Sequence, residues 1–394
     1  MEASDVLAPR QLALVTALRA ALHACPEPAG QERRTKALLM DFLRANTSLT
    51  LVDRGSWFYA AHRETQNRAP APGPHAGCQP GQPGQPGGQP GPHAGCQPGQ
   101  PGGIALRADF DALPTPGGAA HLCGHDGHAA ALCGTALLLE GRTVGRDVFL
   151  LFQPAEETGQ GAKGCLPLLA EEPVAEIYGA HNLPGLPLGL VTTRAGTFAC
   201  GSHGVTLRFA GTPAHAASPA EGRSPAPALG ALLYGLPELT APERFAGFTL
   251  CTAVGCRMGQ KAFGSAAADA ELWLTLRADT DDGLSALHTA ILRRARSLAA
   301  AQKLSFSATV QDDFPATVND AAAAARVLAL CGGQPLAAPM RWSEDFGWYL
   351  RQCRGAFFGI GAGEHCPALH TAAYQYPDAL LAPTAAAFRR LIGG

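Results

Sequence analysis

The sequence predicts an α/β protein in which a mixed, mostly parallel sheet is sandwiched by helices, with a second, α+β domain inserted into the chain. Short apolar runs alternate with helical stretches in the first half, which is typical of a parallel sheet covered on both faces. From about residue 201 the strands alternate more clearly between polar and apolar residues, and the earlier pattern returns near residue 314. The 394 residues are 46% hydrophobic, so the chain can bury more than one core.

Apolar periodicity locates the individual elements. Leu14, Leu18 and Leu22 mark a first helical face, and residues 38–43 mark a second. In the first half we expect strands at 104–108 (IALRA), 148–152 (VFLLF) and 176–180 (EIYGA), with helices near 128–140 and 162–171. Later we expect strands at 205–211, 249–254, 270–278 and 356–361 (AFFGIG), with helices at 225–239 and 281–301.

Composition excludes several classes of function. With 30 basic and 32 acidic residues the net charge is −2, so nothing indicates binding to nucleic acid or to an anionic membrane. The first ten residues lack the apolar segment of a secretory signal, and no apolar run is long enough to span a membrane. The 12 cysteines show no framework spacing and are interpreted as mostly reduced. We therefore expect a cytoplasmic protein.

One segment is of low complexity. Residues 72–84 (PGPHAGCQPGQPG) recur unchanged at residues 90–102. Gly, Pro and Gln bury too little apolar area to offset the entropy of ordering, so we expect residues 66–103 to be a flexible insertion. His75, Cys78, His93 and Cys96 could suggest metal binding, but one His and one Cys per copy make a poor site.

Polar side chains follow the predicted strands where those strands end. Because the carboxyl ends of parallel strands meet at one edge of a sheet, these side chains should converge. Imidazole, carboxylate and thiolate groups together indicate a metal site. Any one of them alone could be a structural or solvated group. The residues are Asp109, Asp111, residues 123–128 (CGHDGH), Glu156, Glu157, His181 and His370.

The two adjacent glutamates suggest a division of labour. Side chains of neighbouring residues on a turn point in different directions, so one carboxylate can bind a metal while the other holds a proton. The sequence does not by itself decide which of Glu156 and Glu157 does which.

These residues resemble the aminoacylase and carboxypeptidase-type metallopeptidases. The resemblance is greatest to their amidohydrolase branch, which contains N-acyl-amino-acid, hippurate and auxin-conjugate hydrolases. The most specific evidence for this resemblance is the motif CGHDGH followed by PAEE. The matching stretches, in order, are residues 23–27 (HACPE), 105–114 (ALRADFDALP), 122–129 (LCGHDGHA), 152–163 (FQPAEETGQGAK), 179–189 (GAHNLPGLPLG), 211–215 (GTPAH), 344–346 (EDF) and 369–371 (LHT).

The resemblance implies a role for each matching side chain. Glu156 would be the general base, Asp111 would orient a ligand from behind, and His215 on the inserted domain would help to hold the oxyanion. Cys123 would bridge two metal ions. One or two divalent ions, Zn or Mn, would be bound by Cys123, His125, Glu157, His181 and His370.

The resemblance also implies the domain organisation. A catalytic domain would comprise residues 1–65, 104–200 and 312–394, and residues 201–311 would form a lid and dimerisation domain. The chain would be a homodimer through that inserted domain. His215 could instead be an ordinary solvated loop histidine.

The activity implied is metal-dependent hydrolysis of N-acyl amino acids. A dipeptidase of the same family is one alternative. A catalytically decayed binding protein is another, because residues 262–268 (AFGSAAA) lack the Asn that relatives carry in this motif. Arg223, Arg257 and Lys261 are candidates for binding a substrate carboxylate, although each is more simply interpreted as an exposed cation.

Overall fold

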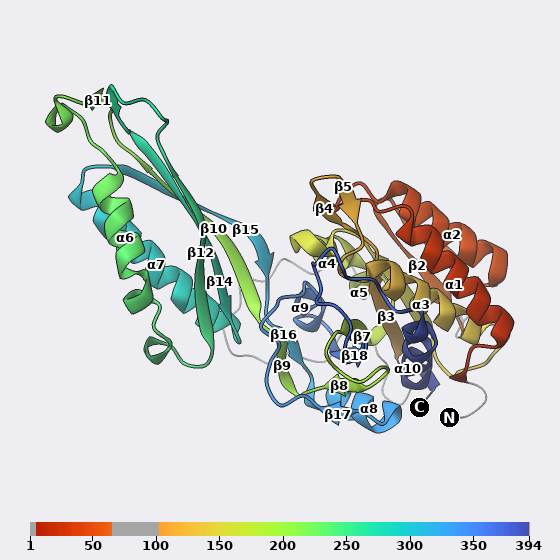
Figure 1. Ribbon diagram of the computed structural model, residues 1–394. Helices are drawn as coiled ribbons and strands as arrows, with labels where there is room; N and C mark the ends of the chain where they lie inside the picture. Colours follow the sequence, from red (N-terminus) through yellow and green to blue (C-terminus); the bar gives the residue numbers. More distant parts are fainter. Residues whose placement is uncertain (1–4, 65–101, 394) are drawn as a thin grey trace, which may run out of the picture.

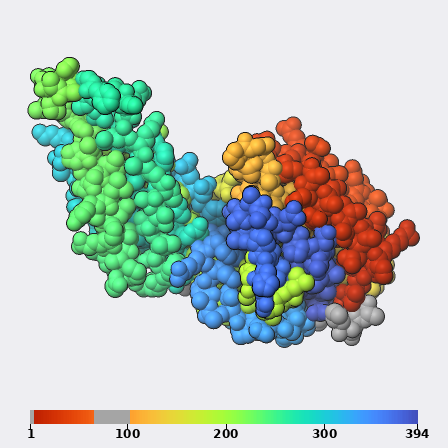
Figure 2. Space-filling model, viewed as in Figure 1, coloured from red at the N-terminus to blue at the C-terminus, as the bar shows by residue number. Residues whose placement is uncertain are grey.

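The computed structural model describes residues 5–64 and 102–393 of the 394-residue chain. These residues form two lobes, one built on an eight-stranded sheet and the other on a four-stranded sheet (Figure 1). Figure 2 shows the smaller lobe projecting from the larger one. The predicted fold class is confirmed. The predicted insertion at residues 66–103 lies almost wholly outside the described residues, and no described helix is long and apolar enough to cross a membrane.

The larger sheet has four parallel strands at its centre. Its order is β1-β2-β6-β3-β7-β18-β8-β17, with β2 antiparallel to β6 and β8 antiparallel to β18. The carboxyl ends of β3, β6, β7 and β18 therefore lie along one edge. The strands are β1 Thr50–Arg54, β2 Trp57–His62, β3 Gly103–Asp109, β6 Val148–Gln153, β7 Val174–Leu183, β8 Val191–Thr193, β17 Gln334–Pro335 and β18 Arg354–Gly361.

Helices cover both faces of this sheet, which is why its central strands are largely buried and mostly apolar. Ile104 and Leu106 on β3 pack into the core under one helix layer, and Ala105 packs into the core under the other. The first layer contains α1 Pro9–His23, α2 Arg33–Asn46, α3 His125–Leu139, α8 Ala321–Cys331 and α10 Leu381–Gly393. The second contains α4 Gly161–Cys165, α5 Pro167–Glu171 and α9 Gly347–Leu350.

The prediction of one continuous helix over residues 162–171 is wrong, although the segment is helical. The segment forms two short helices, α4 and α5, which meet at Leu166. Pro167 occupies the first position of α5, because a proline lacks the N–H that a continuous helix needs and its ring clashes with the preceding turn.

The inserted lobe is an antiparallel sheet of order β12-β14-β10-β15 with two helices on one face. On the sheet, Val254 is 60% exposed and Val310 is 43% exposed, so apolar side chains also remain uncovered. β12 is a free edge of this sheet among the described residues. The elements are β10 Gly201–Ala210, α6 Ala226–Leu239, β12 Thr249–Met258, β14 Asp269–Ala278, α7 Asp281–Ala301 and β15 Ser305–Phe314.

A short neck joins the lobes. The chain enters the inserted lobe after β9 (Gly196–Ala199) and returns through β16 (Thr317–Asn319), and these two strands pair with each other. The remaining short elements are β4 Leu113–Thr115, β5 Gly118–Ala120, η3 Glu156–Thr158, β11 Ala214–His215, η4 Pro219–Glu221, η5 Pro242–Arg244, β13 Ser265–Ala266 and η6 Asp378–Leu380.

Candidate active site

The loop before α3 places two candidate ligands at the carboxyl edge of the larger sheet. Cys123 and His125 flank Gly124, whose φ of 96° lies in the left-handed region. A Cβ on Gly124 would lie 2.5 Å from Oδ1 of Asn182 and 2.7 Å from the Tyr374 hydroxyl. Only glycine allows this turn, which brings both flanking side chains to one site.

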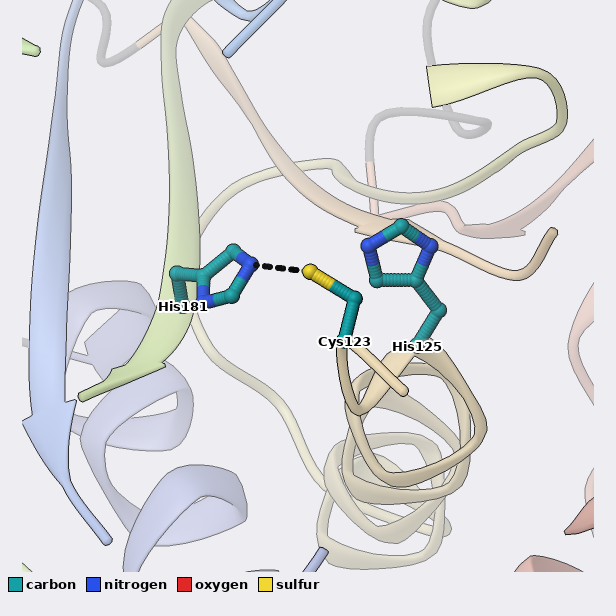
Figure 3. Close-up of side chains that lie close together, drawn as sticks. All are labelled: Cys123, His125 and His181. Carbon is teal, nitrogen blue, oxygen red and sulfur yellow. Dashed lines mark hydrogen bonds between the residues drawn. The ribbon is translucent and has the colours of Figure 1, made fainter. Parts of the chain in front are cut away.

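Side chains from four segments converge there. Sγ of Cys123 lies 3.3 Å from Nε2 of His181 on β7, as Figure 3 shows, and 3.3 Å from Nε2 of His370. Oε1 of Glu157 lies 3.8 Å from Nε2 of His125 and 3.8 Å from Nε2 of His370. The five predicted ligands thus form one cluster of closely spaced donor atoms.

The chemistry of this donor set fits a divalent transition ion. Nε2 of His125 and Oε1 of Glu157 are buried and have no hydrogen-bond partner among the described residues. Buried polar atoms are rarely left unpaired in proteins, and imidazole, thiolate and carboxylate are the groups that zinc and similar metals prefer.

Neighbouring groups orient the buried imidazoles of His181 and His125 for binding a metal ion. Nδ1 of His181 donates to the Asn182 carbonyl over 2.8 Å, and burial lowers the pKa of His181 well below its usual value. The ring is therefore neutral, with its Nε2 lone pair directed into the cluster. Nδ1 of His125 lies 3.1 Å from both the carbonyl oxygen and Oδ1 of Asp111.

Asp111 also contacts a second predicted ligand. Its Oδ2 accepts a hydrogen bond from the backbone N–H of Glu157 over 3.1 Å. One carboxylate thus orients the His125 ring and holds the turn that carries Glu157.

The electrostatics of the cluster favour a positive charge at its centre. Burial raises the pKa of Glu157 to about 7. Burial raises the pKa of Glu156 well above its usual value, and repulsion from Glu344 and Glu157 raises it further. Burial alone would lower the pKa of His125, yet Asp109 and Cys123 raise it well above normal. A cation would relieve these unfavourable interactions.

A buried charge network supports the cluster from beneath. The guanidinium of Arg107 is fully buried and pairs with Asp109 over 2.6 Å, Glu344 over 2.9 Å and Asp345 over 2.8 Å. Asp109 in turn lies 2.6 Å from Nδ1 of His128. From the sequence, Glu344 and Asp345 were known only as part of a stretch that resembles the family (residues 344–346). The structure shows that both pair with Arg107 on β3.

Four members of the cluster, Cys123, Glu157, His181 and His370, line a cavity of about 470 Å³ between the two lobes. From the inserted lobe, Thr275 and Arg277 on β14 and Phe314 on β15 contribute to its walls. A larger cavity, about 700 Å³, lies near the amino ends of β6, β7 and β18 and contains none of the clustered ligands.

Four predicted residues of the inserted lobe do not line this cavity: His215, Arg223, Arg257 and the exposed Lys261. His215 lies in β11, at the far tip of the inserted lobe (Figure 1), where it is exposed and pairs with Ser265 of β13. Arg223 is exposed and pairs through its backbone with Thr212 at the same end. Arg257 lies 3.5 Å from Glu271 on the inserted sheet.

Arg277 lines the cavity and is a cation that no sequence pattern singled out. Burial lowers the pKa of its guanidinium, and among the described residues it has no acidic side chain within ion-pair distance. The predicted strand at residues 270–278 contained it, but strand periodicity does not tell which end of the strand faces the other lobe.

Comparison with known protein families identifies the family of the chain that forms this cavity. The sequence pattern of peptidase family M20/M25/M40 matches residues 105–393, nearly three quarters of the chain. The chain belongs to this family. It is therefore an enzyme, a metal-dependent hydrolase of the metallopeptidase and amidohydrolase type, and the predicted resemblance is confirmed.

Relatives in the M20/M25/M40 family are named for amide hydrolysis. N-acetyldiaminopimelate deacetylase of Leuconostoc citreum is 28% identical over 302 residues, covering 71% of this chain and 77% of the relative. IAA-amino acid hydrolase ILR1-like 2 of Arabidopsis thaliana is 30% identical over 281 residues, covering 66% and 64%. A crystal structure of a dinuclear metal-binding family member from Bacillus subtilis shares the fold, with a TM-score of 0.73, 23% identity and 98% coverage of both chains.

Proposed function

We propose that this member of peptidase family M20/M25/M40 hydrolyses N-acyl amino acids to a carboxylic acid and a free amino acid. The observation that carries the proposal is that one cavity contains both the Cys123 cluster and Arg277, which has no acidic partner among the described residues. The Cys123 cluster would bind the scissile carbonyl through its metal ion. The guanidinium of Arg277 would bind the carboxylate of the amino acid that is released. Relatives named as deacetylases and amino-acid conjugate hydrolases support the same substrate class.

The residues that would hold one or two ions of Zn or Mn are Cys123, His125, Glu157, His181 and His370. Such an ion supplies Lewis acidity to the scissile carbonyl and to the attacking water. Asp111 keeps His125 and Glu157 in position for this task.

Glu156 moves the proton. Its carboxylate lies beside the ligands, with Oε2 3.8 Å from Nε2 of His125. A carboxylate oxygen of Glu156 accepts a proton from the attacking water and returns it to the leaving nitrogen. Burial, followed by repulsion from Glu344 and Glu157, raises the pKa of this carboxyl, which makes its carboxylate form a stronger base.

Arg277 binds the α-carboxylate of the substrate. Its Nη1 donates to Oγ of Ser343 over 2.8 Å, which holds the guanidinium at the cavity wall. A half-buried guanidinium without an acidic partner among the described residues is well suited to a bidentate carboxylate.

The inserted domain, residues 201–311, is proposed as a lid and homodimer interface. β12 is a sheet edge and presents the exposed apolar side chains Val254 and Met258. Closure of the lid or approach of a second copy is needed to bring His215 to an oxyanion, because its strand β11 lies at the tip of the inserted lobe. Cys133, Cys165 and Cys200 are buried free thiols, which supports a cytoplasmic location.

A substrate panel tests the proposed function. Purified enzyme supplied with Zn or Mn should release amino acids from N-acetyl and N-benzoyl amino acids with higher kcat/KM than from free dipeptides. Higher kcat/KM on dipeptides would identify a dipeptidase. No release from either class would identify a decayed relative.

A further inference from the structure

Trp342 forms an aromatic wall of the active-site cavity. Its ring centroid lies 5.3 Å from that of His181, one of the proposed metal ligands. On another side it packs edge-on against Phe198, with centroids 6.0 Å apart. The indole is partly buried against the core beneath it and lines the cavity with its remaining surface.

The segment that carries Trp342 is held on both sides. Before it, Met340 donates its N–H to Phe198 over 2.7 Å and accepts one from Cys200 over 3.0 Å. After it, Glu344 is held by Arg107 in the buried charge network. The indole is therefore a fixed wall that a substrate must fit.

Arg277 holds the residues on either side of this tryptophan. Its Nη1 donates to the Arg341 carbonyl over 3.2 Å and to Oγ of Ser343 over 2.8 Å. Trp342 thus lies between the ligand His181 and the residues that anchor Arg277.

This placement determines which part of a substrate the indole meets. In the proposed function, the scissile carbonyl lies at the ligand cluster and the α-carboxylate lies at Arg277. The atoms between these two groups are the nitrogen and Cα of the amino acid, from which its side chain branches. The amino-acid side chain, and not the acyl group, therefore lies against Trp342.

The rest of the wall has a matching character. Phe314 and Leu369 add apolar surface to the cavity. Asp312, also at the wall, is exposed and repels a second carboxylate. Such a subsite accepts flat, apolar side chains and disfavours acidic ones.

We infer that Trp342 is the specificity-determining residue of this enzyme and makes it prefer N-acyl derivatives of aromatic and large apolar amino acids over those of small or acidic ones. The inference rests on the proposed function. It adds which amino-acid side chains of the substrate the enzyme prefers, because the assignment to amide hydrolysis does not specify them.

The test keeps the acyl group constant and changes the amino acid. The wild-type enzyme should show its highest kcat/KM on N-acetyl-phenylalanine, a lower value on N-acetyl-alanine and the lowest on N-acetyl-glutamate. Trp342→Ala should reduce the ratio of phenylalanine to alanine derivatives at least about tenfold, as expected for loss of a hydrophobic side-chain contact. Trp342→Phe should retain most of the preference, because it keeps a flat ring.

A binding measurement provides a readout independent of turnover. Calorimetric titration of the full-length protein with the product L-phenylalanine should give a weaker Kd for Trp342→Ala by a similar factor, while the Kd of L-alanine stays unchanged. Trp273→Ala is the matched control, since Trp273 lies on the inserted sheet outside this cavity and should alter neither ratio.

Three results would overturn the inference. An unchanged ratio in active Trp342→Ala and Trp342→Phe enzymes would remove Trp342 from recognition. A change in the ratio of N-hexanoyl to N-acetyl phenylalanine, with the amino-acid preference intact, would place the indole on the acyl side. If the wild-type enzyme cleaves no N-acyl amino acid, the proposed function itself fails, and this inference fails with it.

Discussion

The buried carboxylate of Glu32 accepts a hydrogen bond from the backbone N–H of Ala155, with Oε1 and N 2.9 Å apart. Ala155 has a φ of 54°, a left-handed conformation that is uncommon for a residue other than glycine. It directly precedes Glu156, and the N–H of Glu157 is held by Asp111. Two carboxylates thus fix the strained turn from which the proposed base and one proposed ligand project.

Replacement of Glu32 tests this relationship. Glu32→Ala should lower the free energy of unfolding by about 1–3 kcal/mol, because it removes a charge-assisted hydrogen bond to the partly buried N–H of Ala155. It should also lower kcat more than it changes KM, since the turn carries Glu156. Urea denaturation and steady-state kinetics measure the two effects.

Glu32→Gln is the matched control, and it adds a pH dependence. An amide keeps the acceptor oxygen, so activity should persist. Burial raises the pKa of Glu32 above its ordinary value of 4.5. A carboxyl with a raised folded-state pKa contributes most to stability below its unfolded pKa and loses that contribution as pH rises. The Gln variant should therefore gain stability relative to the wild type as the pH rises above 4.5, and a relative loss would contradict the explanation.

Glu156→Gln separates proton transfer from metal binding. The variant should keep its metal content, since Glu157 is the proposed ligand, while kcat falls roughly 10²- to 10⁴-fold with the loss of the base. Metal analysis and hydrolysis of one N-acetyl amino acid measure both properties. Loss of metal from Glu156→Gln, but not from Glu157→Gln, would reverse the two assignments.

The convergence of ligands could be anticipated from the sequence, whereas the far wall of the cavity could not. Each of Asp111, Glu157 and His181 follows a predicted parallel strand, and parallel strands end at the same edge. Arg277 of the inserted lobe bonds to the two residues that flank Trp342 across the boundary between the lobes, and local periodicity does not describe such a contact.

The position of His215 outside the cavity could not be predicted from the sequence for the same reason. Its motif indicated a role in the site, but the motif says nothing about how far the lobe extends. In the structure β11 lies at the tip of that lobe (Figure 1), so a role for His215 requires a movement or a partner.

Arg277→Gln should weaken substrate binding. We expect KM for N-acyl amino acids to rise about 10- to 100-fold, because a charge-assisted hydrogen bond contributes about 1.5–3 kcal/mol. Amides that lack the α-carboxylate should be affected little. Arg257→Gln is the control, since Arg257 lies near Glu271 and does not line the cavity. An equal loss on both substrate types would show that Arg277 is structural.

Replacement of residues 66–101 by a short linker should leave melting temperature, metal content and activity unchanged. His62 and Ile104 both pair with Val148, on opposite sides of β6, at the edge of the sheet away from the site. Twice the strand spacing is roughly 10 Å, which four to six residues span easily. The linker must preserve the bonds of Glu64 to Asp147 and of Arg146 to the Gly102 carbonyl. Loss of metal with folding intact would show that the repeat, with its His75 and Cys96, contributes to the site.

Metal content and hydrolysis, measured together on one preparation, test the central claim most directly. The purified enzyme should contain one or two divalent transition ions per chain and release the amino acid from an N-acyl amino acid. Chelation should remove both the ions and the activity, and Zn or Mn should restore both in the wild type but not in a Cys123→Ala, His181→Ala double variant. Full hydrolysis by ion-free enzyme, or by that double variant, would contradict the account.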